Sequence, residues 1–505
     1  YDGYAYKIEL DDNGGLYIGV DITNTNLGDV YLPPHFSPDD ALGLITTISD
    51  EPNPDFKSIA LLKYNTDDGS LVWRVMPQGT VYINTRQATI RQIQMDSNNT
   101  IHALMGFQNG VHLDGALTVT GAQYLKFYVV KYDTDGNYLG HVDMHLDGGF
   151  IGSYTDFRYD ENLNRYYIAG HRGDGGLDEY WHMILNGVPL QEQAHIMAFN
   201  AGTGNLIWIK ESGAGETIFR DFKINDIEID SESNLYITGK YFLDANVPEV
   251  TFAGYAFPEE MSGNHIYAMK LNSAGAVQWL RTPSGYTTEI YTGSNFSYDL
   301  ALKDDEVLIA AQGTNEIWGD FSITRPLGFY CDPTLLHLDK QTGVPVAFHE
   351  VKTISGYNDA FTAVTVDNDN NIIVGGYFYY DLFTADDDNV PTVTKVGGNA
   401  DFTDFFVAKF ANVPCGTGNG TVSVEEVKAD VLAVYPNPAS DVVNIQSQQM
   451  LSSYEVVNML GQVLLKGSFA QGQNQIVIEN LSAGTYIINV KTVGNTSIST
   501  KIIKE

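Results

Sequence analysis

The sequence predicts an all-β protein in which a β-propeller of six blades precedes a small C-terminal β-sandwich. Two recurring lines of sequence lead to the propeller: each line is a pair of short apolar strands around a polar turn, and the two lines alternate, six copies of each, along residues 1–412. Short apolar alternations between Pro, Gly and Asn residues predict the sandwich over residues 431–505. A chain of 505 residues exceeds what one hydrophobic core usually serves, which agrees with more than one domain.

The first line of the repeat has an acidic turn between its strands and ends in small residues. Its copies begin at Tyr6, Ile93, Phe157, Ile227, Leu300 and Val364. The second line has a turn rich in polar residues and Gly, and its copies begin at Ile59, Phe127, His195, Ile266, Leu335 and Phe405. Each pair of lines supplies four strands, and four-stranded antiparallel units repeated in a ring form a propeller. The repeats give six blades, and seven is the alternative.

A long segment separates the second and third strands of every unit, although a hairpin needs only a few residues there. The segments are residues 21–57, 107–126, 171–194, 240–265, 312–334 and 377–404. Because all of them occupy one topological position, we expect them to form a thick, decorated face of the disc. Part of each segment is expected to add a hairpin, as around Thr251 and Phe252.

The sixth unit stops at Phe410, one strand short of four. We expect residues 421–424 or residues 4–6 to complete it, because an open sheet edge invites aggregation. One lysine recurs at the same register of the second line, and its long side chain predicts a structural reach towards the acidic turns. Its copies are Lys63, Lys131, Lys270 and Lys409.

Composition excludes several classes of function. The chain carries 28 basic and 63 acidic residues, for a net charge of −35, whereas nucleic-acid binding needs clustered Lys and Arg. Anionic membrane surfaces are disfavoured for the same reason. The sequence contains no apolar run long enough for a transmembrane helix. It also lacks a nucleophile elbow, a zinc-protease motif and a phosphate loop, so we expect no enzymatic activity and no catalytic residue.

Two acidic segments raise the question of calcium. Oxygen ligands stand at alternate positions in Asp367, Asp369 and Asn371, but the Gly and the twelfth-position acid of a calcium loop are missing, and the place in the repeat favours a β-turn. The second segment, read together with Asp381, has three adjacent carboxylates that repel unless water or a cation screens them. They are Asp386, Asp387 and Asp388. We expect no cofactor, with calcium as the open alternative.

The chain has two cysteines, Cys331 and Cys415. They are too few for a disulfide scaffold, and two readings stay open: a disulfide between them in an oxidising compartment, or two buried thiols. Cys415 falls in residues 413–430, a Gly-rich and Val-rich segment that we interpret as a linker.

The last residues of the chain carry several short elements in a fixed order. They are Tyr435-Pro436-Asn437-Pro438, a Gly461-Gln462 turn, Gly484 and Tyr486 in one strand, and Lys501 to Lys504 at the end. Together they resemble the type A C-terminal sorting domain of the type IX secretion system of Bacteroidetes. The resemblance implies export through the periplasm and outer membrane to the cell surface or the medium, with the secretion machinery as partner. It also implies that an export signal was removed before Tyr1.

The repeats resemble seven-bladed propeller repeats of bacterial surface proteins, and residues 198–208 are similar to the tryptophan-docking repeat of quinoprotein dehydrogenases. Trp73 and Trp279 stand at places comparable to Trp208. Such likeness implies a fold rather than a chemistry. We therefore expect a secreted or cell-surface binding, adhesion or scaffold module for an unidentified surface, glycan or protein. The alternative is a secreted propeller enzyme, either a polysaccharide hydrolase or lyase or a degenerate quinoprotein.

Overall fold

The computed structural model divides into two compact units, Tyr1–Phe410 and Ala411–Glu505. It describes residues 4–11, 13–23, 25–26, 31–32, 35–37, 40–41, 57–81, 88–148, 156–171, 183–213, 222–243, 250–258, 263–287, 295–325, 330–353, 357–383, 392–395, 403–410, 433–446, 451–458, 463–469, 474–492 and 497–505. Within these ranges the chain is built of strands, with one 3-10 turn, η1 (Leu113–Gly115), so the predicted all-β class is confirmed. No helix in the described ranges has the length and apolar character needed to cross a membrane.

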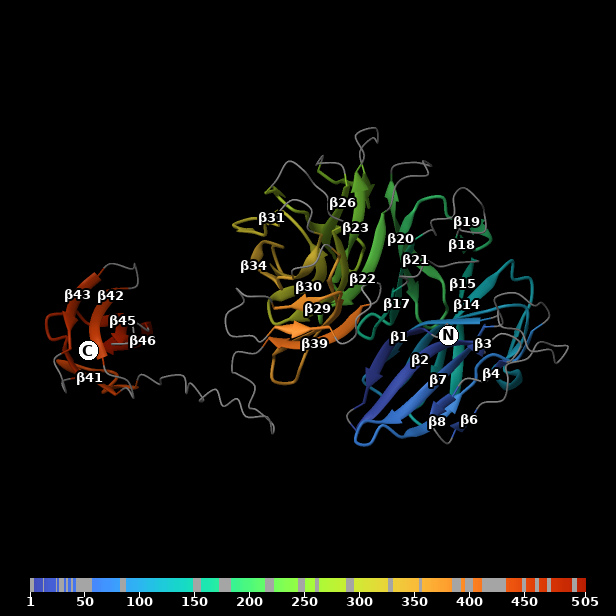
Figure 1. Cartoon of the computed structure of the whole chain (residues 1–505), viewed down its shortest axis with the longest axis horizontal. Coiled ribbons are helices and arrows are strands. Elements are labelled where there is room, and N and C mark those ends of the chain that lie inside the picture. Colours follow the sequence, from blue (N-terminus) through green and yellow to red (C-terminus); the bar gives the residue numbers. More distant parts are fainter. Residues whose placement is uncertain are drawn as a thin grey trace. The chain divides into compact units, whose positions relative to one another are not determined.

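Six antiparallel sheets make up the larger unit (Figure 1). The first three, each in spatial order, are β1 (Tyr4–Leu10), β2 (Gly15–Thr23), β7 (Lys57–Asn65) and β8 (Leu71–Val75); β10 (Ala88–Met95), β11 (Ile101–Phe107), β14 (Leu125–Tyr132) and β15 (Tyr138–Gly148); and β16 (Asp156–Asp160), β17 (Arg165–His171), β20 (Ala194–Asn200) and β21 (Leu206–Gly213).

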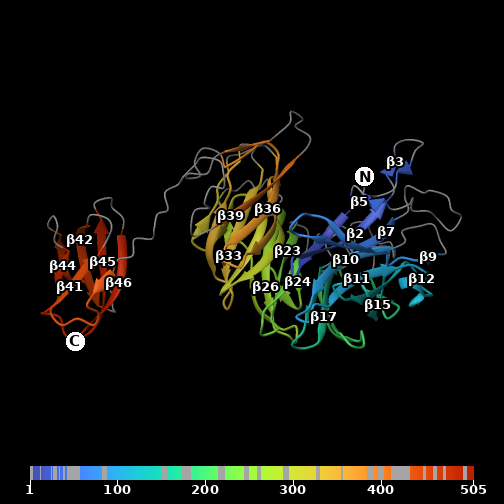
Figure 2. The same ribbon diagram turned by 90° about the horizontal axis from the view of Figure 1, so that it is seen from below.

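The other three sheets continue the pattern. They are β22 (Lys223–Ile229), β23 (Leu235–Leu243), β26 (Gly263–Leu271) and β27 (Val277–Arg281); β29 (Phe296–Lys303), β30 (Glu306–Gly313), β33 (Asp332–Asp339) and β34 (Pro345–Glu350); and β35 (Ala360–Val366), β36 (Ile372–Phe378) and β39 (Asp404–Phe410). The first strands of consecutive sheets are in contact, and the sheets follow one another along an arc (Figure 2). This is the propeller-like order that the six repeats predict.

The acidic turns of the first line are local hydrogen-bonded structures. In four of them, one aspartate carboxylate accepts the backbone N–H groups two and four residues later, which closes a tight hairpin turn. The aspartates are Asp11, Asp96, Asp230 and Asp367. The recurring lysine reaches these turns as predicted, since Lys63 Nζ lies 3.6 Å from Asp11 Oδ2 and Lys409 Nζ lies 2.7 Å from Asp367 Oδ2.

Each long insertion adds short strands, as expected, and these strands pair with other strands. They are β3 (Thr25–Asn26), β4 (Tyr31–Leu32), β5 (His35–Ser37) and β6 (Asp40–Ala41) in the first insertion; β12 (Gly110–His112) and β13 (Leu117–Val119) in the second insertion; β18 (Met183–Leu185) and β19 (Val188–Pro189) in the third; β24 (Thr251–Phe252) and β25 (Tyr255–Ala256) in the fourth; β31 (Glu316–Trp318) and β32 (Phe321–Ser322) in the fifth; and β37 (Asp381–Leu382) and β38 (Val393–Thr394) in the sixth.

From the second sheet onwards, the inserted hairpin pairs with the outer end of the preceding sheet. Strands β18 and β24 pair directly with the outer strands β15 and β21. Strands β12 and β31 pair with β9 (Thr80–Val81) and β28 (Gly285–Tyr286), which directly follow the outer strands β8 and β27. A bridge from Thr353 to Leu382 does the same at the fifth junction. The expected decorated face is therefore in part an inter-sheet clasp, a role that the sequence reading did not foresee.

Tryptophans of the outer strands dock on the next sheet. The indole N–H of Trp208 donates to the carbonyl of Ser273 at 3.1 Å, and that of Trp73 donates to Thr134 at 3.0 Å. Gly275 lies directly under the Trp208 ring with φ +76°, and a Cβ there would stand 3.2 Å from the indole. The quinoprotein-like repeat thus serves packing between sheets.

The sixth sheet is the exception to full coverage. Phe405 and Val407 precede Lys409 as Phe127 and Val129 precede Lys131, yet the first pair is 85% and 70% exposed and the second pair is fully buried. The described residues therefore do not close the ring. Residues 4–6 do not supply the missing strand, because they are part of β1, which pairs with β2. The other expected segment, residues 421–424, lies outside the described residues.

The C-terminal unit is a two-layer β-sandwich, as predicted. One sheet contains β40 (Ala433–Tyr435), β41 (Val442–Gln446) and β44 (Gln475–Val477); the other contains β43 (Val463–Ser468), β42 (Leu451–Asn458), β45 (Gly484–Thr492) and β46 (Ser497–Lys504). Its core is filled by alternate apolar residues of both sheets, among them Val443, Val456, Ile476, Ile488 and Ile502.

The exposure difference between equivalent phenylalanines gives a direct test of the open sheet face. Phe127→Ala should lower the free energy of unfolding of the larger unit by about 3–5 kcal/mol, because it empties a fully buried site. Phe405→Ala should change it by about 0.5 kcal/mol or less, because the ring is exposed. Urea unfolding of the full chain measures both. Equal losses would mean that the face of the sixth sheet is covered.

Candidate functional site

The residues of the sorting motif gather at the C-terminal strand. Asn437 donates from Nδ2 to the carbonyl of Lys501 at 2.9 Å and accepts the N–H of Ile503 at 2.8 Å. Two further backbone bonds join Ala439 to Ile503 and to Glu505. The loop that contains Tyr435, Pro436 and Pro438 is therefore fixed against β46.

The remaining sorting residues take three positions. Tyr486 is buried in β45, and its hydroxyl donates to the carbonyl of Ser482 at 2.7 Å. Gly484 begins the same strand, and Lys504 ends β46 with its side chain largely buried. The Gly461-Gln462 turn lies outside the described residues. The sequence motif thus includes a surface loop, in which Tyr435 is 52% exposed, and two buried residues, Tyr486 and Lys504, whereas Gly484 and Lys501 are exposed.

The candidate calcium residues that the structure describes form the acidic turn between β35 and β36. Asp367 is held by Lys409, by two backbone N–H groups and by the side-chain amide of Asn371, so its oxygens serve the turn. The Lys409 ammonium and the Asn371 amides hold the pKa of Asp367 well below its usual range. Asp369 is exposed, and Asp386, Asp387 and Asp388 lie outside the described residues. No group of three or more His, Cys, Asp or Glu side chains suited to a metal ion occurs in the part of the chain that is described.

Cys331 is fully buried, and its thiol lies 3.5 Å from the side-chain oxygen of Asn295. Its N–H donates to Asn358 at 3.1 Å. Cys415 lies outside the described residues, so the disulfide between the two cysteines stays a prediction.

A line of side-chain acceptors connects the first strands of the six sheets, and we call it the acceptor ladder. At every junction a side chain of one sheet accepts a backbone N–H from the first strand of the next sheet. The pairs are Asp21 with Ile90 (2.9 Å), Gln94 with Tyr159 (2.6 Å), Asp156 with Ile227 (2.8 Å), Asp226 with Leu300 (2.8 Å) and Asp299 with Val364 (2.8 Å).

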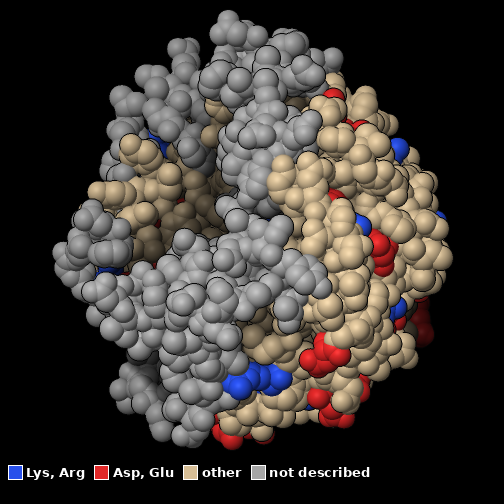
Figure 3. Space-filling view, turned by 90° about the vertical axis from the view of Figure 1, so that its right-hand side faces the viewer, with Lys and Arg blue, Asp and Glu red and all other residues tan. Residues whose placement is uncertain are grey.

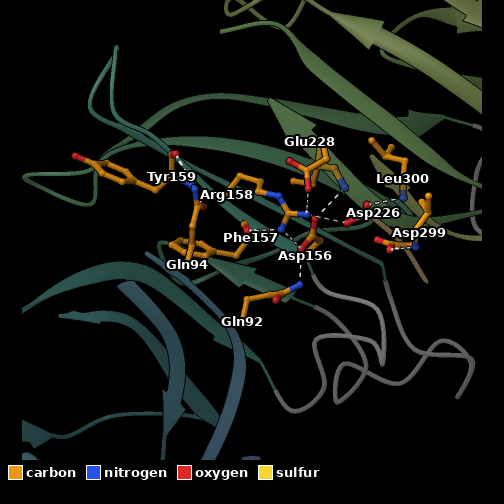
Figure 4. Close-up of polar contacts among 12 residues, drawn as sticks. Gln92, Gln94, Asp156, Phe157, Arg158, Tyr159, Asp226, Glu228, Asp299 and Leu300 are labelled. Atoms are coloured by element: carbon orange, nitrogen blue, oxygen red, sulfur yellow. Dashed lines mark hydrogen bonds and ion pairs between the residues drawn. The ribbon is translucent and has the colours of Figure 1, made fainter. Parts of the chain in front are cut away.

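Arg158 lies at the middle of this ladder (Figure 4). Its guanidinium contacts Asp156 at 2.7 Å, Glu228 at 2.9 Å and Asp226 at 3.0 Å, and only 4% of the residue is exposed. Burial opposes its charge, but the three carboxylates outweigh burial and hold the pKa of Arg158 above its ordinary value. Gln92 also contacts Asp156. The network neutralises carboxylates that the ladder needs inside the protein.

The sequence reading missed the ladder, although a signal was present. An aspartate stands directly before the first line in three copies, as Asp156, Asp226 and Asp299 before Phe157, Ile227 and Leu300. A recurring charge at the edge of an apolar strand indicates a buried partner. Arg158, the second residue of the third copy, was not singled out either.

A row of aromatic side chains lies at the end of the sheets from which the insertions leave. Phe296 and Tyr298 begin β29, Tyr377 is near the end of β36, and Tyr379 follows that strand. Tyr357 stacks on Tyr379 with 4.7 Å between ring centroids. The row was not recognised in the sequence, because its members come from two different sheets and are far apart along the chain.

Charged side chains are spread over the surface. On the side of the molecule shown in Figure 3, acidic groups recur over the described surface among larger uncharged areas. The described residues of that side show no broad basic patch.

Comparison with known proteins assigns the C-terminal unit. Residues 433–505 match the family described as the secretion system C-terminal sorting domain. No curated protein matches the chain. Solved structures with a similar arrangement include a protein of unknown function from Bacteroides caccae, with 11% identity, 62% of this chain and 78% of that chain covered, and a TM-score of 0.30.

Two further similar structures are propeller proteins. The β-propeller domain of the Trilobed protease from Pyrococcus furiosus has 7% identity, covers 88% of this chain and 89% of its own, and gives a TM-score of 0.33. The quinohemoprotein alcohol dehydrogenase from Comamonas testosteroni has 9% identity, with 73% of this chain and 55% of that chain covered, and a TM-score of 0.32. These values carry no argument about activity.

The fold and the sorting domain together define a class: a secreted protein with a propeller-like unit and a C-terminal export domain. More particularly, the chain is a substrate of the type IX secretion system, exported to the cell surface or the medium, and its sorting domain is the part that the secretion machinery recognises.

Removal of the central cation should strongly destabilise the larger unit. Arg158→Ala leaves Asp156 and Asp226 buried without their counter-charge, and we expect a loss of about 3–5 kcal/mol in the free energy of unfolding. Lys303→Ala, at the surface pair with Asp304, is the control and should cost about 1 kcal/mol or less. Chemical unfolding of both full-length variants measures the two losses in the free energy of unfolding. Equal losses would contradict the role given to Arg158.

Asn437 should matter for both the fold and the export of the C-terminal unit. Asn437→Ala removes two hydrogen bonds to β46, so we expect a loss of about 1–2 kcal/mol in the stability of that unit and less protein outside the cell. Gln475→Ala, which removes one exposed bond to Asn444, is the control. Immunoblots of cell and medium fractions measure export, and thermal unfolding of the full chain measures stability. Unchanged export and stability would contradict the role given to the two hydrogen bonds between Asn437 and β46.

Proposed function

We propose that the protein is a non-enzymatic binding protein, which the type IX system exports and which holds a partner through its propeller-like unit. The observation that carries this proposal is the aromatic row, a group of neighbouring rings left partly exposed at the ends of two sheets. Exposed aromatic clusters are typical of binding surfaces.

The charged groups of the unit support a binding role because their contacts are structural. Asp156, Asp226 and Glu228 are engaged by Arg158. His102 is 2% exposed and lies between Asp96 and the hydroxyl of Tyr166. Burial lowers the pKa of His102, which keeps the ring neutral in the core. Groups that are bound in this way stabilise the sheets.

Asp332 is a carboxyl group whose pKa is raised, and it does not favour the enzyme alternative. Burial raises the pKa of Asp332 to about 8, with Glu350 adding to the rise and Arg325 opposing it. Such a protonated acid resembles a general acid in its pKa, but Asp332 is fully buried and bonds Thr353 and Arg325 at the fifth clasp. A catalytic acid must reach the bond that it protonates.

The proposal is tested by measuring binding and turnover together. The purified full chain is incubated with a panel of polysaccharides and with proteins from the cell envelope and the medium. We expect saturable retention on at least one of them and no release of reducing ends, unsaturated sugars or peptides. Products that accumulate in proportion to protein concentration would contradict a non-enzymatic role, and no retention on any material would contradict a binding role.

A further inference from the structure

We propose that the aromatic row is a binding site for a neutral polysaccharide. The inference rests on the proposed binding function and names the chemistry of the ligand. Its members are Phe296, Tyr298, Tyr377, Tyr379, Tyr357 and Tyr380.

The rings form one continuous line across the fifth and sixth sheets. Phe296 and Tyr298 lie 4.6 Å apart between ring centroids, and the hydroxyls of Tyr298 and Tyr377 lie 3.3 Å apart. The line continues from Tyr377 to Tyr379 at 6.5 Å between centroids and from Tyr379 to Tyr357 at 4.7 Å. Tyr380 closes it, 5.7 Å from Tyr357.

The row belongs to the surface and not to the core. Tyr357 and Tyr380 are 41% and 37% exposed, and the other four rings are partly exposed. By contrast, Tyr17, Tyr166 and Tyr236 of the sheet interiors have no exposed surface. Packing of the described sheets alone gives no reason to keep six neighbouring aromatics at the surface, whereas a ligand that covers their faces does.

The chemistry of the row fits a sugar chain. A pyranose ring offers an apolar face of C–H groups and a rim of hydroxyls, so it needs flat rings beside hydrogen-bonding groups. The stacked pair Tyr357 and Tyr379 supplies the flat surface. The side-chain oxygen of Gln312 accepts the hydroxyls of Tyr298 at 2.8 Å and of Tyr377 at 3.3 Å, which fixes the polar edge of the row.

Charge favours a neutral sugar over an acidic one. The chain has a net charge of −35, which opposes an approaching polyanion. Beside the row, the Nζ of Lys240 lies 5.0 Å above the Phe296 ring, so its charge is partly directed at that ring. Burial raises the pKa of Tyr377, so its hydroxyl is protonated at neutral pH and acts as a neutral polar group.

The test is native gel electrophoresis of the full chain in gels that contain laminarin, galactomannan, xyloglucan or dextran, with alginate as the acidic comparison. We expect at least one neutral polysaccharide to retard the protein. Tyr357→Ala and Tyr379→Ala should weaken that binding about tenfold or more. Tyr255→Ala, which removes an equally exposed tyrosine of the β24–β25 hairpin, is the matched control and should leave it unchanged. Tyr357→Phe keeps the ring and should bind normally.

Three outcomes would overturn the inference. One is the absence of retardation by every neutral polysaccharide; if an envelope protein is then retained by the full chain, the binding function stands and only the sugar ligand is wrong. Another is retardation that Tyr357→Ala and Tyr379→Ala leave unchanged, which places the site elsewhere. The third is a loss of binding that Tyr255→Ala shares, which indicates a general effect of surface tyrosines.

Discussion

The acceptor ladder is the interaction on which the larger unit depends. A twisted sheet that is apolar on both faces must pack between two others, but apolar packing alone leaves the sheets free to slide. One bond from a backbone N–H to a side-chain acceptor at each junction fixes the register of one sheet on the next. Because the acceptors are mostly carboxylates in a water-poor interior, each bond is strong, and each carboxylate needs compensation. Arg158 provides it for Asp156 and Asp226.

The ladder works at the inner strands, and the inserted hairpins repeat its task at the outer ones. A sheet bound to its neighbour at both edges has little freedom to shift, so part of each of these insertions serves the fold. The aromatic row lies at the end of the fifth and sixth sheets. The sorting domain directs the protein to the secretion system and requires no particular chemistry of the unit that is exported with it.

Local sequence patterns predicted the turns and hairpins well. They did not predict the pairings between residues that are far apart in the chain. The turns at Asp11 and Asp367 follow from the chain within a few residues, so the hairpins and their lysines were predictable from sequence. Trp208 was predictable because its repeat fixes its neighbour. The clasp of β18 on β15 joins residues from different repeats, and no periodicity encodes such a pairing. The same holds for the aromatic row, whose members Tyr298 and Tyr377 meet only in the folded unit. Of the two segments expected to complete the sixth sheet, residues 4–6 pair instead with β2, the strand that follows them in the chain.

The claim that insertions fasten the sheets together is open to one direct measurement: hydrogen–deuterium exchange of the full chain, followed by mass spectrometry. If the account is right, peptides that contain β12, β18, β24 and β31 exchange as slowly as those of the outer strands β15 and β21, because their N–H groups bond a neighbouring sheet. Exchange of these four hairpins at the rate of unprotected loops, with the outer strands still protected, would contradict it.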